Sequence, residues 1–190
     1  MADNTTIVVD IGAYQDAIVA DIKAAFPQFK TVEFDREEED REPLDAADLP
    51  AILLDITEFE HDRDGERNDG RLAMHARVEA CVVIGYRTVR AKTAARSAAG
   101  ALAAWMRLRR FTGPNCWTEA AHVIGAYREE FKAMMDRYVA WRVEWSQTVQ
   151  LGASVYPEEF GGPVTPVFSF APDIGLGHED AYKPLLPGGA

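Results

Sequence analysis

Apolar side chains recur at every third or fourth position near the start of the chain. Five of them would lie along one face of a helix: Ile11, Tyr14, Ile18, Ile22 and Phe26. Asp10 precedes this run as a helix-capping residue, and Pro27 follows it as a stop signal. The pattern therefore predicts an amphipathic helix of about four turns between residues 10 and 27.

A two-residue alternation replaces that spacing further along the chain and predicts strands. Residues 30–34 are a short candidate. Residues 51–60 place Ile52, Leu54 and Ile56 on one face and become polar in their outer half. Residues 72–86 resume the alternation after Asp-Gly and Asn-Asp-Gly turn signals. We expect the two long strands to form a hairpin with a polar tip, residues 61–71, that projects beyond the core.

A second helix is predicted for residues 88–110, which are rich in alanine. Small and apolar side chains form one stripe along it: Ala91, Ala95, Ala98, Leu102 and Trp105. Such a stripe lets the helix approach a sheet or another helix closely. A Gly-Pro-Asn turn at residues 113–115 ends it, and residues 119–127 are a strand candidate that Gly125 interrupts.

The last strand of the predicted sheet is residues 138–152. Its apolar face carries two tryptophans, Trp141 and Trp145, which we expect to pack in the core. Residues 128–137, just before it, have both helical and loop character. Residues 35–48 contain few apolar side chains and are expected to form a loop.

These elements predict an α+β fold: a mostly antiparallel sheet of four to five strands, with the two main helices packed on one face. This domain would occupy residues 1–152. Residues 153–190 hold six of the ten prolines and six of the fourteen glycines, so an extended C-terminal arm is expected there. The arm also contains several aromatic and aliphatic residues, which are expected to lie on a surface of this chain or of a partner.

The composition is that of a globular protein, with 47% hydrophobic and 27% charged residues. No apolar run approaches the roughly 20 residues that span a bilayer, and acidic residues stand where a secretory signal needs basic ones. Cys81 and Cys116 lack the paired spacing of a disulfide or metal motif. We therefore expect a cytoplasmic protein with two reduced thiols, no membrane contact and no bound metal.

Charge is distributed unevenly along the chain, whose formal net charge is −11. Residues 33–69 contain sixteen acidic residues and four arginines, whereas residues 87–110 contain seven basic residues and no acidic one. Opposed patches of this kind suit head-to-tail contact between identical copies. The candidate interface residues are Arg87, Arg90, Arg96, Arg107 and Arg109. Two alternatives remain: solvated charges on loops and a helix face, or a nucleic-acid contact through residues 87–110.

Catalytic signals are sparse. The four histidines are scattered, and neither a nucleophile elbow nor a glycine-rich phosphate loop occurs. A calcium loop starting at Asp64 fails because its sixth position is Asp69 and its twelfth is His75. We expect no catalytic residue and no cofactor. The alternative from another class is a small metal-dependent hydrolase that uses Asp55, Glu58, His61 and Asp62.

Three segments resemble the tail terminator proteins of long-tailed bacteriophages, also called minor tail or tail completion proteins. They are the Ile18-x-x-x-Ile22 helix that runs into Phe26-Pro27, the Leu49-Pro50-Ala51-Ile52 entry to a strand, and the closing run WRVEWSQTVQLG at residues 141–152. From the first to the last, they span about 140 residues of the chain. The acidic segment and the proline-rich arm depart from the family's pattern, and they leave open which face meets the tube and what the arm contacts.

The resemblance implies a structural subunit of a closed ring, commonly of six copies, at the end of a finished tail tube. Such a ring ends tube polymerisation and offers the surface for head joining, so its partners would be itself, the major tail tube protein, a head–tail connector or neck protein, and a sheath protein. DNA would only pass through the lumen. The acidic residues expected on the lumen or the tube-facing rim are Glu58, Glu60, Asp62, Asp64 and Glu66. The protein would reside in the virion at the neck, after assembly in the cytoplasm of the host bacterium. A head-completion or neck connector protein is the alternative within this class.

Overall fold

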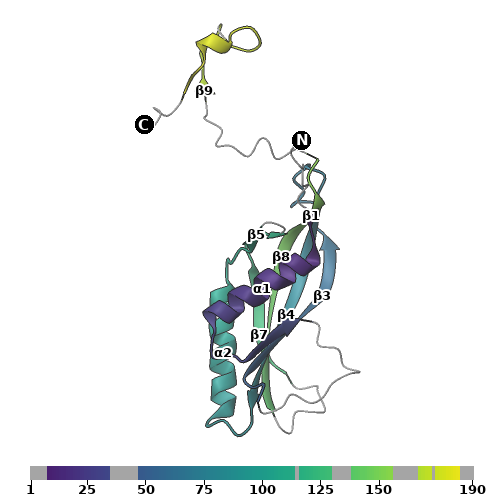
Figure 1. Cartoon of the computed structure of the whole chain (residues 1–190), viewed down its shortest axis with the longest axis vertical. Coiled ribbons are helices and arrows are strands. Elements are labelled where there is room, and N and C mark those ends of the chain that lie inside the picture. The colour runs from purple at the N-terminus through teal and green to yellow at the C-terminus, as the bar shows by residue number, and fades with distance from the viewer. Residues whose placement is uncertain are drawn as a thin grey trace, which may run out of the picture. The chain divides into compact units, whose positions relative to one another are not determined.

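A computed structural model describes residues 8–34, 47–113, 116–129, 138–155, 167–172 and 174–184 (Figure 1). The chain divides into two compact units, residues 1–155 and residues 156–190. The first unit holds the main sheet and both α-helices. No helix in the described ranges is long and apolar enough to cross a membrane.

The first helix forms where the apolar spacing predicts it. Helix α1 is Ile11–Ala25, and Asp10 caps it by accepting a hydrogen bond of 2.7 Å from the Ala13 backbone N–H. Tyr14, Ile18 and Ile22 are fully buried on its inner face. The capping residue and the apolar stripe therefore fix both the start of the helix and the side that it turns to the core.

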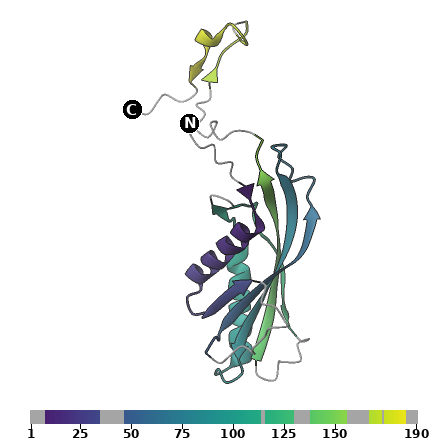
Figure 2. The ribbon, with the colours of Figure 1, turned by 45° about the vertical axis from the view of Figure 1, so that its right-hand side comes forward.

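The main sheet has six strands, in the order β1-β8-β4-β3-β2, with β7 also paired to β8 (Figure 2). Their bounds are β1 Val8–Val9, β2 Thr31–Phe34, β3 Ala51–His61, β4 Leu72–Gly85, β7 His122–Arg128 and β8 Tyr138–Ala153. Because β4 pairs with β8 along residues 138–151, β7 and β1 share the other edge of β8. The α+β class and the mostly antiparallel sheet are confirmed. Strand β2 lies parallel to β3, an orientation that the alternation alone does not specify.

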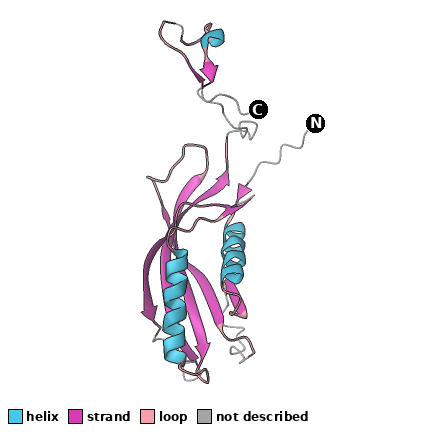
Figure 3. Cartoon of the chain, turned by 90° about the vertical axis from the view of Figure 1, so that its left-hand side faces the viewer, coloured by secondary structure: helices cyan, strands magenta, loops and turns pink. Residues whose placement is uncertain are grey.

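Helix α2, Ala91–Met106, packs on the sheet, and both helices lie on the same side of it (Figure 3). Its buried side chains are Ala91, Ala95, Ala99, Leu102 and Met106. The predicted stripe is therefore shifted by one residue at two places: Ala98 and Trp105 pack half-buried against the core, while Ala99 and Met106 are fully buried. The predicted start at residue 88 is also too early, because Arg90 has a φ of 55° and stands outside the helix.

A β-bulge in β3 determines which way its acidic side chains point. Ile56 pairs with Val78 and Glu58 with Arg77, so Thr57 is the extra residue. Directly paired residues share a face. Asp55, Glu58 and Glu60 therefore all lie on the side of the sheet that faces away from the helices, here named the outer face.

Residues 156–190 contain a small structure of their own. Strands β9 (Val167–Phe168) and β10 (Lys183–Pro184) pair antiparallel, and a 3-10 helix, η2 (Glu179–Ala181), lies between them in the chain. The Tyr182 hydroxyl accepts a hydrogen bond of 2.8 Å from the Gly175 backbone N–H. Residues 167–184 of the expected C-terminal arm thus contain a short antiparallel ladder.

Candidate assembly surfaces

One side of the sheet ends in a partly unpaired strand. Strand β2 pairs with residues 51–54 of β3 only, and no other described strand lies against that edge of residues 55–61. We call residues 55–61 the β3 edge. Asp55 and residues 57–61 are exposed, including Phe59 at 38%. Within the described ranges, Asp55 and Glu60 form no ion pair. Backbone groups on such an edge are free to pair with another chain.

The opposite side of the sheet ends in β7, residues 122–128, which we call the β7 edge. Among the strands described, β7 pairs only with β8. Its exposed apolar side chains are Ile124 and Tyr127, at 40% and 44%. Arg128, at its end, lines the same cavity as Lys92 and Arg96 of α2. The two edges are therefore unlike: the β3 edge is acidic, and the β7 edge has cations beside it.

Four of the five predicted interface arginines face solvent. Arg87 and Arg90 lie exposed between β4 and α2, Arg96 lies on the exposed side of α2, and Arg107 follows the helix. Arg109 is different, because its guanidinium lies 3.3 Å from the Asp21 carboxylate and 4.0 Å from the centre of the Trp105 ring. It connects α1 to the end of α2 within one chain, so we leave it out of the interface.

The predicted acidic rim also separates into two groups. Glu60 and Asp64 are exposed, and Glu58 is exposed 3.5 Å from Arg77. Glu66 accepts a backbone hydrogen bond from Ala73 at 3.4 Å and lies 2.9 Å from a ring nitrogen of His61. Asp62 is half-buried and accepts hydrogen bonds from the Thr148 hydroxyl and the Gly65 N–H. The Thr148 hydrogen bond lowers the pKa of Asp62 below its usual value, against a smaller opposing effect of burial.

The loop between β3 and β4 folds back onto the outer face instead of projecting from it. The Gln150 side-chain amide donates to the Gly65 carbonyl at 2.8 Å, and the Val155 N–H donates to the Asp69 carbonyl at 2.7 Å. Asp62 and Glu66 take part in this anchoring. The tip is therefore solvated only in part: residues 62, 65, 66 and 69 find partners on β4, on β8 and at Val155, while residues 63, 64, 67 and 68 are exposed.

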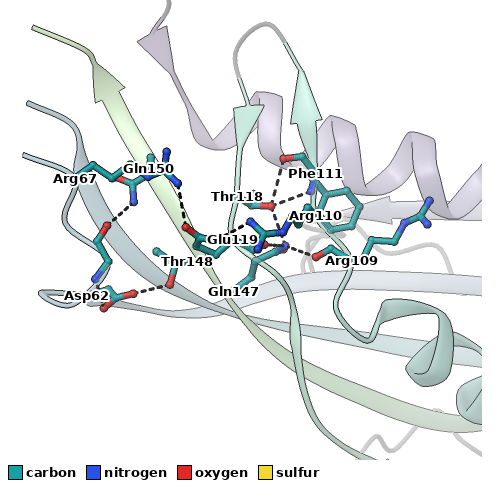
Figure 4. A network of polar contacts seen from close by, with 11 residues as sticks. Asp62, Arg67, Arg109, Arg110, Phe111, Thr118, Glu119, Gln147, Thr148 and Gln150 are labelled. Carbon is teal, nitrogen blue, oxygen red and sulfur yellow. Dashed lines mark hydrogen bonds and ion pairs between the residues drawn. The ribbon is translucent and has the colours of Figure 1, made fainter. Parts of the chain in front are cut away.

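A buried amide on the helix side of β8 is the residue that the sequence interpretation missed (Figure 4). Gln147 is 1% exposed, and its amide donates to the Arg109 and Glu119 carbonyls and to the Thr118 hydroxyl, at 3.0, 2.7 and 2.9 Å. Its carbonyl accepts from the Tyr14 hydroxyl at 3.0 Å. The available signal was its place between Trp145 and Val149, where the alternation requires an inward side chain.

The outer face carries a network of ion pairs across the central strands. Arg142 of β8 lies 3.1 Å from Glu79, 2.9 Å from Glu144 and 3.9 Å from Glu129. Arg77 of β4 lies 3.3 Å from Glu144 and 3.5 Å from Glu58. These cations are engaged within the chain, so the centre of the outer face offers less uncompensated charge than the two edges do.

The residues of the alternative hydrolase are not brought together. Glu58 lies beside Arg77, His61 beside Glu66 and Asp62 beside Thr148, while Asp55 lies across from Glu79. Across the described ranges, no group of three or more His, Cys, Asp or Glu side chains has the geometry to hold a metal ion. Neither Cys81 nor Cys116 forms a disulfide, and burial raises the pKa of the Cys116 thiol to about 11, with a smaller contribution from Asp10.

The comparisons with known proteins give no family: no protein-family model matches the chain, and no curated protein matches it.

Proposed function

We propose that this chain is a structural subunit of a long-tailed bacteriophage tail, a tail terminator that closes into a ring on the end of the tail tube. The observation that carries the proposal is the pair of unlike edges on opposite sides of one sheet. A contact between two different surfaces of identical chains is heterologous, and it generates a ring when the rotation between neighbours closes. The acidic β3 edge of one copy would meet the β7 edge and the α2 cations of the next.

Charge and backbone pairing act together in this contact. The exposed carboxylates of Asp55 and Glu60 make the β3 edge negative, and the exposed cations Lys92 and Arg96 make the surroundings of the β7 edge positive, so the two edges attract each other. Backbone groups on residues 55–61 add hydrogen bonds of the kind that extend a sheet from one chain to the next. Acidic residues on the edge also discourage pairing with the wrong chain, because like charges would then meet.

The remaining parts of the proposal follow from the resemblance. The ring would have six copies, would end polymerisation of the major tail tube protein, and would present a surface to a connector or neck protein at the head end of the tail. Asp64 and neighbouring acids that do not meet the next copy would lie on the lumen or the tube-facing rim. There, negative charge lets DNA pass without adhering.

The test is assembly of the purified chain, alone and with isolated tail tubes, measured by native mass spectrometry and negative-stain electron microscopy. We expect annular particles that cap tubes. A variant with Asp55→Lys and Glu60→Lys should lose them, whereas Asp16→Lys with Asp180→Lys, two exposed acids that do not belong to the β3 edge, makes the same charge change and should keep them. A chain that stays monomeric at every concentration and leaves tubes uncapped would contradict the proposal. Rings that bind a head connector but no tube would identify a neck protein instead.

A further inference from the structure

A cavity of about 330 Å³ opens beside the β7 edge. Its walls come from three places in the fold: Lys92 and Arg96 of α2, Arg128 at the end of β7, and the start of β8. The Trp141 ring lies in the wall, with the Arg96 guanidinium 5.6 Å from its centre. Two tyrosines, Tyr86 and Tyr138, also line the cavity. Cations and hydroxyl groups thus converge on one concave surface.

The described residues that line this cavity carry a positive net charge, although the chain as a whole is strongly negative. Among them are three cations and one carboxylate, Glu129, which lies 3.9 Å from Arg142 on β8. Lys92 forms no ion pair within the part of the chain that the structure describes. Clustered, solvent-accessible cations beside aromatic rings suit a ligand that carries several carboxylates.

We propose that this cavity binds the acidic run that follows β2 in a neighbouring copy of the chain, residues 35–45. The inference rests on the proposed head-to-tail assembly and names the contact that would hold it. The run contains seven acidic residues and two arginines, a net charge of −5 on a short stretch. It leaves the described chain after Phe34, at the end of the edge strand on the acidic side of the sheet. In the proposed junction that side faces the next copy's β7 edge.

The length of the acidic run favours binding to the cavity of a neighbouring copy over binding to the cavity of the same chain. From β2 to β7 the sheet is four strand spacings wide, about 19 Å at roughly 4.8 Å each. Twelve extended residues span at most about 40 Å, and the run must return to Ala47, whose carbonyl accepts from the Lys30 ammonium at 3.1 Å. It would have to stretch fully, out and back, to cross its own sheet. In the proposed junction, the edge that carries the run meets the edge beside the next copy's cavity.

The experiment measures binding of a fluorescently labelled peptide, residues 33–46 of this sequence, to the full chain by anisotropy. The chain carries Glu37→Gln, Glu38→Gln and Glu39→Gln so that its own run does not compete. We expect saturable binding that weakens at least tenfold in Lys92→Ala with Arg96→Ala. Removing two exposed cations elsewhere, with Lys23→Ala and Arg63→Ala, should change the affinity less than twofold. A peptide with glutamines and asparagines in place of the acids should not bind.

The possible results distinguish the proposed peptide site in the cavity from the proposed ring assembly. Absence of peptide binding, or an equal loss of peptide affinity in the two double variants, overturns this inference even if the unmodified chain forms rings. Peptide binding by a chain that never assembles supports the cavity and contradicts the ring. A single-stranded oligonucleotide of equal charge is the competitor: displacement of the peptide at equal or lower concentration overturns the inference in favour of a nucleic-acid site, and failure to displace it supports the acidic peptide.

Discussion

The Gln147 side chain joins three separate parts of the chain through four hydrogen bonds. Gln147→Leu would fill a similar volume but leave the buried Tyr14 hydroxyl and the Glu119 carbonyl without their partner, while the Arg109 carbonyl keeps the Ala121 N–H. Because unsatisfied buried groups cost about 1–3 kcal/mol each, we expect the free energy of unfolding to fall by about 2 kcal/mol or more in urea titrations. Tyr14→Phe removes only one of these bonds and should cost about 1 kcal/mol. Equal losses in the two variants would contradict the assigned role of Gln147.

Asp62 makes stability depend on pH in a defined direction. Its carboxylate accepts hydrogen bonds from Thr148 and Gly65 in the folded state, so its folded pKa lies below the ordinary value of 3.8. The unfolded chain therefore binds a proton more readily, and the stabilisation is present above pH 3.8 and is lost as the pH falls through the folded pKa. Unfolding measured between pH 7 and pH 2.5 should show the wild type losing its advantage over Asp62→Asn in that window. Repeating the comparison in a Thr148→Val background should reduce the loss, and an unchanged loss would rule out the hydroxyl as its cause.

Among single residues, the alternation locates the buried ones better than it locates their partners. Trp145 and Val149 are fully buried, as their positions predict. Gln147 occupies an equally inward position but required the structure, because its partners belong to α1 and to residues 109–119, far away in sequence. Arg109 was assigned to an interface for the same reason: its pairing with Asp21 depends on how α1 crosses the end of α2.

Helix α2 is an element whose close approach to the sheet depends on alanine. Ala99 is fully buried, whereas a side chain added at Gly100 meets no other atom within 4 Å. Ala99→Leu should therefore overpack the interface and lower the free energy of unfolding by about 1–3 kcal/mol. Gly100→Ala should raise it by about 0.5–1 kcal/mol, because alanine favours the helix. Thermal and urea unfolding of the two variants test the pair, and a stable Ala99→Leu would show that α2 packs loosely.

Elements were easier to predict than their ends and their pairing. Periodicity locates both helices and the four longest strands of the sheet, since each has one apolar side. The start of α2 was missed because a left-handed residue at Arg90, not a capping side chain, delimits it. The two-residue β1 has too few positions for any period to show, and the parallel pairing of β2 depends on the crossing of the chain from one strand to the next.

Across the whole molecule, the core belongs to residues 1–155. Every buried apolar side chain in the described ranges lies there, while Val167, Phe170 and Leu176 of the second unit are more than half exposed. A chain that ends at Val155 should therefore unfold with a free energy within about 1 kcal/mol of the full chain's. Urea unfolding followed by tryptophan fluorescence measures this, since all four tryptophans precede residue 155. A larger loss would mean that residues 156–190 contribute to the stability of the first unit.

The proposed contact between copies combines information of two kinds. Uneven charge along the chain is visible in the sequence, and it indicated assembly. The sequence does not show which charges remain available for a contact between copies. Folding pairs Arg110 with Glu119 and Arg142 with Glu79, while it leaves Lys92 and Glu60 exposed. The unlike edges of the sheet emerge only once strand order is known, since they lie on strands that are about 60 residues apart in the chain.

The bulge in β3 has a consequence for how this hairpin tolerates changes of length. Thr57 has no counterpart on β4, so the ladders on its two sides would join in phase if it were removed, and Glu58 and Glu60 would keep their orientation. Loss of one residue within β4 would instead shift the alternation along the rest of that strand, so its inward and outward side chains would exchange faces. Thr57 is thus the point at which related chains can differ by one residue while the acidic margin stays on the same side.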